Sequence, residues 1–156
     1  MYFLESVFNS NNFDLNDAVL SEYNIFFDEN DKKYNQFSLD DEDIPDLNRF
    51  VSTLKDSDPD CNIYVLIYGY ELTSSNGEKF TYADQLWIDT KLSIDEVKEL
   101  VSTAGMTEPS DIRYFCDCNE VEYGQIYLIS RSENGDPVIS EIEKENAGQI
   151  VTLYWD

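Results

Sequence analysis

The chain has 156 residues, with 33 aspartates and glutamates against 10 lysines and arginines, so its formal net charge is -23. A protein this acidic does not hold nucleic acid or an anionic membrane through its own cations. Its apolar content of 42% and aromatic content of 14% are enough for one sizeable core, unlike those of a disordered acidic tail. We therefore expect a single acidic domain over residues 1–156.

Apolar residues in the first sixty positions follow a helical spacing. Leu15, Ala18 and Val19 lie at i, i+3 and i+4 behind a possible cap at Asp14, which predicts a short helix over residues 14–23. Residues 28–43 are polar and predict a loop.

A second helix is predicted after this loop, with Asp43 as its cap and Pro45 in its first turn. Its apolar stripe follows the i, i+3, i+4 and i+7 pattern of a helix face and consists of Leu47, Phe50, Val51 and Leu54. Residues 1–60 are thus expected to be mainly helical.

Residues 61–156 alternate apolar and polar side chains, which predicts mainly sheet. Two hairpins are indicated by Asn-Gly pairs at Asn76-Gly77 and Asn134-Gly135, because such pairs tolerate positive φ angles. The predicted strands span residues 62–72, 79–89, 111–117, 124–131, 137–142 and 149–155. One helix interrupts them over residues 93–104, where Ser93 and Glu96 form a capping box and Gly105 ends the helix. The predicted fold class is α+β, with an antiparallel sheet of about five or six strands packed with two or three helices.

The absence of histidine makes an enzyme a minority interpretation, since histidine is the usual proton carrier near neutral pH. Two carboxylates in a cleft could still hydrolyse a glycoside, but nothing marks one pair above the others. That alternative predicts a concave cluster of carboxyls with raised pKa values.

No cofactor and no metal are predicted. The run Asp56, Asp58, Asp60 begins like a calcium loop, but the positions that need glycine and glutamate hold Cys61 and Ile67. Cys116 and Cys118 would share a face of a strand, with only Cys61 left as a further ligand. Three cysteines behind a start without a signal segment predict reduced thiols in a cytoplasmic protein, and no apolar run is long enough to span a membrane.

The densest anionic segment, Asp40 to Asp43 with Asp46, precedes the second predicted helix. One or two acidic residues suffice to offset a helix dipole, whereas four adjacent ones repel each other. The surplus predicts a cationic partner. A halophilic surface would be another explanation, but the many large Asn, Tyr, Phe and Ile side chains argue against it.

The charge also matches that of duplex DNA. A compact chain of this length measures roughly 40 Å along its longest dimension, and 40 Å of duplex carries about 23 or 24 phosphates. If the carboxylates lie on one elongated face, the protein could occupy the cationic groove of a nucleic-acid enzyme.

A resemblance to a known family points the same way. The order of a strand at Ile63, Tyr64 and Val65, then Tyr70, Gly77, Trp87-Ile88-Asp89, an acidic helix and a strand ending at Asp117 is similar to a module of ArdA-like antirestriction proteins. The resemblance covers residues 62–117. It implies a DNA mimic from a phage or mobile element that inhibits a host defence complex and has no catalytic residue.

The sequence therefore predicts an acidic nucleic-acid mimic, of anti-CRISPR or antirestriction type, that blocks a basic nucleic-acid-binding protein. The alternative is an immunity protein that neutralises one basic nuclease toxin by charge-steered association. Tyr64, Tyr68 and Tyr70 are possible contact anchors, although core positions explain their alternation equally well. The predicted partner-binding residues are Asp40, Asp41, Glu42, Asp43, Asp46, Asp56, Asp58, Asp60, Asp117, Glu120 and Glu122.

Overall fold

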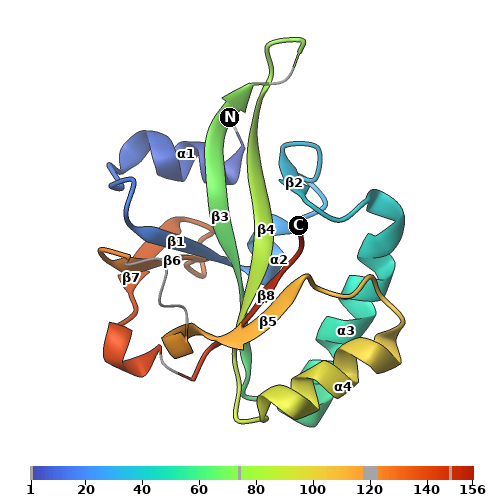
Figure 1. The fold of residues 1–156 in the computed structure, drawn as a ribbon. Helices are drawn as coiled ribbons and strands as arrows, with labels where there is room; N and C mark the ends of the chain where they lie inside the picture. The colour runs from blue at the N-terminus through green and yellow to red at the C-terminus, as the bar shows by residue number, and fades with distance from the viewer. Residues whose placement is uncertain (1, 74, 118–122, 148) are drawn as a thin grey trace.

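A computed structural model of the chain describes residues 2–73, 75–117, 123–147 and 149–156 (Figure 1). It confirms the α+β class, but the sheet is larger than expected and is mixed rather than purely antiparallel. The α-helices of the described chain are α1 (Phe3–Ser10), α2 (Tyr23–Phe26), α3 (Ile44–Ser57) and α4 (Ile94–Ala104). Short 3₁₀ helices are η1 (Asp41–Asp43), η2 (Phe115–Asp117) and η3 (Lys144–Asn146). The strands are β1 (Ala18–Glu22), β2 (Asn35–Phe37), β3 (Asn62–Thr73), β4 (Lys79–Asp89), β5 (Asp111–Tyr114), β6 (Ile126–Arg131), β7 (Pro137–Glu141) and β8 (Val151–Tyr154).

The 8-stranded sheet has the order β5-β8-β4-β3-β1-β6-β7, with β2 added beside β4. Two of its pairings are parallel, namely β1 with β6 and β2 with β4. Parallel neighbours need long crossover connections. Here each of the two connections spans a large part of the chain, so the sequence spacing that identified the hairpins carried no sign of these pairings.

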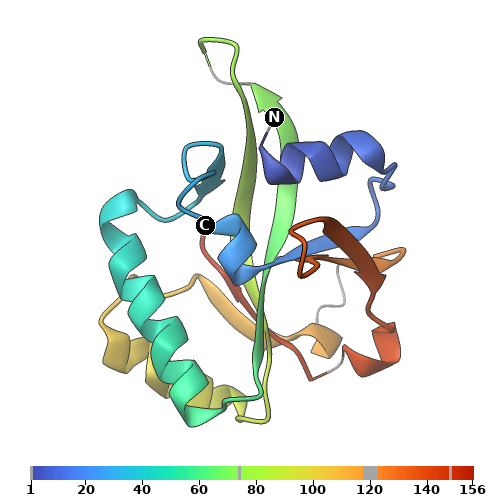
Figure 2. The same cartoon turned by 180° about the vertical axis from the view of Figure 1, so that it is seen from behind.

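Both faces of the central strands are covered, and this explains the continuous apolar run of β3. Val65 and Ile67 face the larger core, beneath the four helices, whereas Tyr64 and Leu66 belong to a smaller core on the opposite face. Trp87 of β4 also packs in the smaller core, against Phe115 and Tyr123. Figures 1 and 2 show α3 and α4 side by side at one flank of the sheet.

Both predicted hairpins are confirmed. Strand β4 has the predicted bounds, and β3 pairs with it antiparallel. Strand β6 pairs in the same way with β7. The turn glycines Gly77 and Gly135 have φ angles of 85° and 84°, in the left-handed region that glycine adopts without strain.

Helices α3 and α4 are also confirmed. Ser93 accepts a hydrogen bond from the Glu96 amide at the start of α4, and Gly105 ends that helix with a φ angle of 70°. At the start of α3, Pro45 lies in the first turn as predicted. Asp43 stands at the N-cap position of α3, as predicted, but its side chain makes no cap hydrogen bond.

Other sequence predictions are wrong in the first half of the chain. Residues 14–23 do not form a helix, because Ala18, Val19 and Leu20 are buried in strand β1 between the two cores. The polar segment 28–43 contains β2 and η1, and helix α1 was not predicted.

One prediction in the second half also needs correction. The predicted strand over residues 111–117 ends at Tyr114 and continues as η2, so Cys116 lies in a 3₁₀ turn. Cys118 lies outside the described residues.

Within the described ranges, none of the helices combines the length and the apolar character needed to cross a membrane.

Candidate functional site

The acidic segment predicted from the sequence forms an exposed rim at the start of α3. Asp40, Asp41 and Glu42 are exposed, and Asp43 and Asp46 are half-buried. The backbone amide of Asp43 donates to the Asp40 carbonyl at 2.9 Å, which closes the η1 turn and holds the carboxylates close together. We call residues 40–43 the acidic rim.

Asp46 faces a cation of its own helix. Its carboxylate pairs with the Arg49 guanidinium at 3.0 Å, and the same guanidinium nitrogen donates to the Ala104 carbonyl at the end of α4. Arg49 thus ties the C-terminus of α4 to α3. The Arg49 cation therefore offsets the charge of Asp46, so Asp46 adds less negative charge to the surface than one carboxylate of the acidic rim does.

Asp58 does not belong to a contact surface, which corrects the sequence prediction. It is only 2% exposed, and its Oδ2 accepts hydrogen bonds from Thr90 Oγ1 at 2.6 Å and from the Lys91 amide at 3.0 Å. These two hydrogen bonds, the Thr90 hydroxyl first, hold the pKa of Asp58 below its usual value. Asp56 and Asp60 on either side are exposed, so the three aspartates do not act as one patch.

The third predicted patch cannot be assembled in the same way. Asp117 is the last residue of η2. Glu120 and Glu122 lie outside the described residues.

Exposed carboxylates also occur outside the acidic rim. Glu133 and Asp136 flank the β6–β7 turn, and Glu143 and Glu145 surround η3. In both views η3 lies on the opposite side of the molecule from α3 (Figures 1 and 2). The exposed carboxylates of the described residues are thus not confined to the side that carries the acidic rim.

A cleft of about 930 Å³ opens beside the acidic rim. It lies between α2, the loop that follows α2, strand β2 and the first turns of α3. Asp40 and Asp41 line it on the η1 side, and Glu29, Lys32 and Lys33 line it on the loop side. The other residues around it are Tyr23, Asn24, Phe26, Phe27, Asn30, Asn35, Gln36, Phe37, Leu39, Ile44, Pro45 and Asn48.

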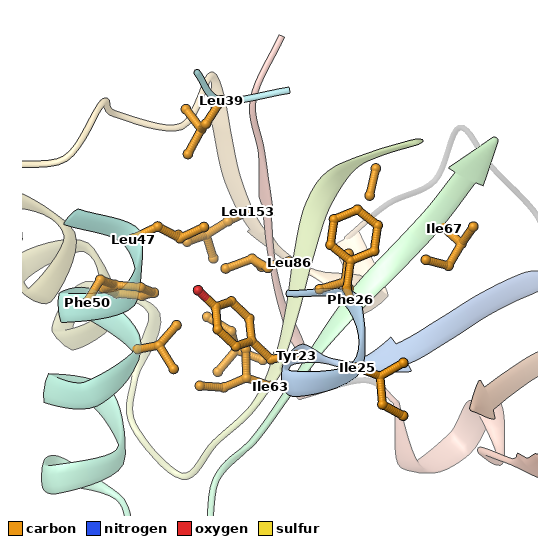
Figure 3. Packing of buried hydrophobic residues seen from close by; sticks show 14 of the residues in the cluster. Tyr23, Ile25, Phe26, Leu39, Leu47, Phe50, Ile63, Ile67, Leu86 and Leu153 are labelled. Atoms are coloured by element: carbon orange, nitrogen blue, oxygen red, sulfur yellow. The ribbon is translucent and has the colours of Figure 1, made fainter. Parts of the chain in front are cut away.

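Aromatic side chains form much of this cleft. The rings of Phe27 and Phe37 are half-buried, with centroids 5.7 Å apart, and Phe26 packs edge-on against Phe27 beneath them. Figure 3 shows the ring of Tyr23 extending from α2 toward α3. Its hydroxyl donates to Asn48 Oδ1, and burial raises the pKa of Tyr23 strongly.

Sequence reasoning missed this cleft. Its aromatic residues lie in α2, directly after α2 and in β2, and neither element was predicted. The pair Phe26-Phe27 beside an acidic segment was a possible signal, but only the pairing of β2 with β4 brings Phe37 next to it.

Two further expectations concern side chains elsewhere. Tyr64 is 9% exposed and packs in the smaller core, so it is not a contact anchor, and the side chains of Tyr68 and Tyr70 lie outside the described residues. Burial raises the pKa of the Asp84 carboxyl, as the enzyme alternative requires of a cluster, but Asp84 does not line the cleft. Among the described side chains, no group of three or more cysteine, aspartate and glutamate residues is placed to hold a metal ion.

No family model matches the chain, and no curated protein and no solved structure is significantly similar to it. The resemblance of residues 62–117 to an ArdA module therefore stays a prediction.

Proposed function

We propose that this protein is an inhibitor that binds a basic nucleic-acid-processing protein through complementary charge. The observation that carries the proposal is an exposed acidic rim, beside an aromatic cleft, on a well-packed domain with a net charge of -23. Uncompensated charge of this size opposes folding by self-repulsion. Binding to a cationic partner explains why the protein carries so many carboxylates although they lower its stability.

Two forms of inhibitor were predicted, and the geometry favours one of them. A nucleic-acid mimic, as an anti-CRISPR or antirestriction protein would be, needs carboxylates arranged along one face like phosphates. Exposed carboxylates lie both at the acidic rim and at η3 on the opposite side, and charge spread in this way steers association from more than one direction. The cleft beside the acidic rim adds a local contact surface to this general attraction. This combination supports an immunity protein that neutralises one cognate basic nuclease toxin.

Capture of the partner from the native host, followed by a competition assay, tests the proposal. The purified complex is challenged with nucleic acid at low and at high salt. Inhibition of a basic nuclease that weakens as salt rises is the expected result, because screening removes the attraction. A partner that is acidic, or binding that is indifferent to salt, would contradict the proposal.

The same assay separates the two forms. A mimic must be displaced competitively by DNA or RNA, and it should inhibit several enzymes that share a substrate. An immunity protein inhibits one toxin tightly, and excess nucleic acid does not displace it if it binds away from the active site.

A further inference from the structure

Asp84 of β4 carries a buried carboxyl oxygen at an irregular point of the sheet. Two consecutive residues of β3 pair with Gln85 and Ala83 of β4, so Asp84 is an extra residue between them, at a β-bulge. Its Oδ1 is buried and has no hydrogen-bond partner among the described residues. A buried carboxylate oxygen that has lost its water without gaining a donor is unfavourable. The negative charge of Asp84 therefore lowers the stability of the fold around it.

On the other edge of β4, Asp84 lies where two strands meet. Strand β2 pairs with β4 as far as Ala83, and β8 pairs with β4 from Gln85 onward. The Ser38 amide, directly after β2, donates to the Ala83 carbonyl at 3.0 Å. The Trp155 amide, directly after β8, donates to the Asp84 carbonyl at 3.0 Å. We call this junction, with its two backbone hydrogen bonds, the β2–β8 seam.

The β2–β8 seam supports one wall of the cleft. Phe37 of β2 lines the cleft and packs edge-on against Trp155, with ring centroids 5.6 Å apart. Figures 1 and 2 both show the C-terminal residue beside the segment around β2. A change in the strength of the seam therefore changes how firmly β2 is held in the cleft wall.

The surroundings of Asp84 offer it another negative charge. Burial is the largest cause that raises the pKa of Asp84, and the Asp156 carboxylate raises it further, against an opposing effect of the residue's own backbone amide. The Tyr154 hydroxyl donates to Asp156 Oδ1 at 3.3 Å, so it is directed to that carboxylate. None of the ion pairs among the described residues includes Asp84.

The other groups around the seam do not neutralise this charge. Across the bulge, β3 presents apolar residues, and Phe37 and Ser38 on the β2 side carry no charge. The strand beyond β8 is β5, where Asp111 and Arg113 pair with each other. The ionisable side chains at Asp84 are Tyr82 of β4, Tyr154 of β8 and Asp156.

We propose that the β2–β8 seam is a pH-sensitive device, in which uptake of a proton by the Asp84 carboxyl strengthens the contact between β2 and the segment after β8. A neutral carboxyl removes both the buried charge and its repulsion from Asp156. The inference goes beyond the proposed function and does not depend on it.

The direction of the pH effect follows from the raised pKa. The folded protein binds the proton of Asp84 more tightly than the unfolded chain, in which the carboxyl has its ordinary value of 3.8. The stabilisation by this proton is therefore complete below that value and is lost as the pH rises through the folded-state pKa.

Carbon-detected NMR of the intact protein tests the first step, since it follows each carboxyl separately from about pH 8 to about pH 4. The midpoint of Asp84 should lie above 3.8, and the amide signals of Ser38 and Trp155 should shift with the same midpoint. A midpoint at or below 3.8, as a hydrogen bond from the Ser38 hydroxyl to the carboxylate would produce, would overturn the proposal. Seam amides that do not follow Asp84 would overturn it as well.

A matched pair of variants separates the seam from the general relief of repulsion on acidification. Asp84→Asn and Asp89→Asn remove the same charge from the same strand, but Asp89 is exposed at the end of β4. Hydrogen exchange, corrected for the intrinsic rate at each pH, measures local opening at the Ser38 and Trp155 amides. In Asp84→Asn, opening at pH 7 should fall by about threefold or more and lose most of its pH dependence. Asp89→Asn should keep the pH dependence of the parent protein, and equal behaviour of the two variants would contradict the proposal.

A third variant leaves Asp84 in place. Asp156→Asn removes the neighbouring carboxylate, so the titration midpoint of Asp84 should fall but stay above 3.8, because burial remains the larger cause. An unchanged or higher midpoint would show that Asp156 does not act on Asp84 and would overturn the proposal.

Discussion

Asp58 shows that a carboxylate in a strongly acidic protein can be a structural residue. It lies just after α3 and holds Thr90 and the Lys91 amide, so it joins the end of that helix to the segment between β4 and α4. Removing it leaves the Thr90 hydroxyl and the Lys91 amide without their acceptor.

We therefore expect Asp58→Ala to lower the thermal unfolding midpoint at pH 7. Asp60→Ala removes the same charge from an exposed position and serves as the control. The folded-state pKa of Asp58 lies below its ordinary value of 3.8. Its stabilisation is therefore complete above that value and is lost as the pH falls through the folded pKa. Circular dichroism melts from pH 7 to pH 3 should show the gap between the variants closing at the acid end. Equal midpoints at pH 7 would contradict this role.

Gly124 is a second residue with a structural role, because the space that a side chain would need there is already occupied. A Cβ atom there would lie 2.8 Å from Asp17 Oδ1. That oxygen cannot move away freely, because it accepts a hydrogen bond from the Gln125 amide at 3.0 Å, while Oδ2 accepts one from the Asp14 amide. Asp17 thus holds the beginnings of β1 and β6 together.

Gly124→Ala should destabilise the protein by about 1 kcal/mol, because the Asp17 carboxylate must give up a hydrogen bond of that strength to make room for the Cβ atom. Urea denaturation measures this value. In the Asp17→Ala background the clash is absent, and the cost of Gly124→Ala should fall to a fraction of it. An unchanged cost in that background would show that the oxygen is not the obstacle.

At the scale of elements, α4 depends on local signals. The Ser93 and Glu96 side chains satisfy amide groups that the first turn leaves open. Ser93→Ala should therefore cost about 1 kcal/mol of stability. Ser102→Ala, at an exposed position within the same helix, should be neutral or slightly stabilising. Chemical denaturation of the two variants distinguishes a cap from a general effect of losing a serine, and equal stabilities would contradict the cap.

Elements defined by local signals were the ones that the sequence predicted. Helix α4 has its capping box, α3 has its proline and apolar stripe, and both hairpins have Asn-Gly turns. Strand β1 was mistaken for a helix because Ala18, Val19 and Leu20 are buried on both faces of the sheet. A strand buried on both faces loses the alternation by which strands are recognised.

Of the candidate site, the acidic rim could be predicted from the sequence and the cleft could not. The charge density of residues 40–43 is visible in the sequence, and these residues do form a rim. The cleft depends on β2. Its three residues are too short a segment to predict a strand, and their pairing with β4 is visible only in the structure. Nothing local distinguishes Asp58 from Asp56 and Asp60 either, because the partners of Asp58 lie more than thirty residues away.

For the whole molecule, the two sides of the charge distribution predict different mutational effects. Reversing Asp40 and Asp41 to lysine changes the charge beside the cleft. Reversing Glu143 and Glu145, which surround η3, changes it by the same amount on the opposite side. Both variants should slow association by weakening the overall field, but only the first should also speed dissociation of the complex. Equal dissociation rates would place the contact surface elsewhere.

The most direct test is the rate at which the protein associates with its captured partner, measured by stopped flow over a series of salt concentrations. Steering by a charge of -23 predicts that the rate constant falls by roughly tenfold or more as sodium chloride rises from about 20 mM to about 500 mM. A rate constant that stays flat over this series would show that the carboxylates do not guide binding.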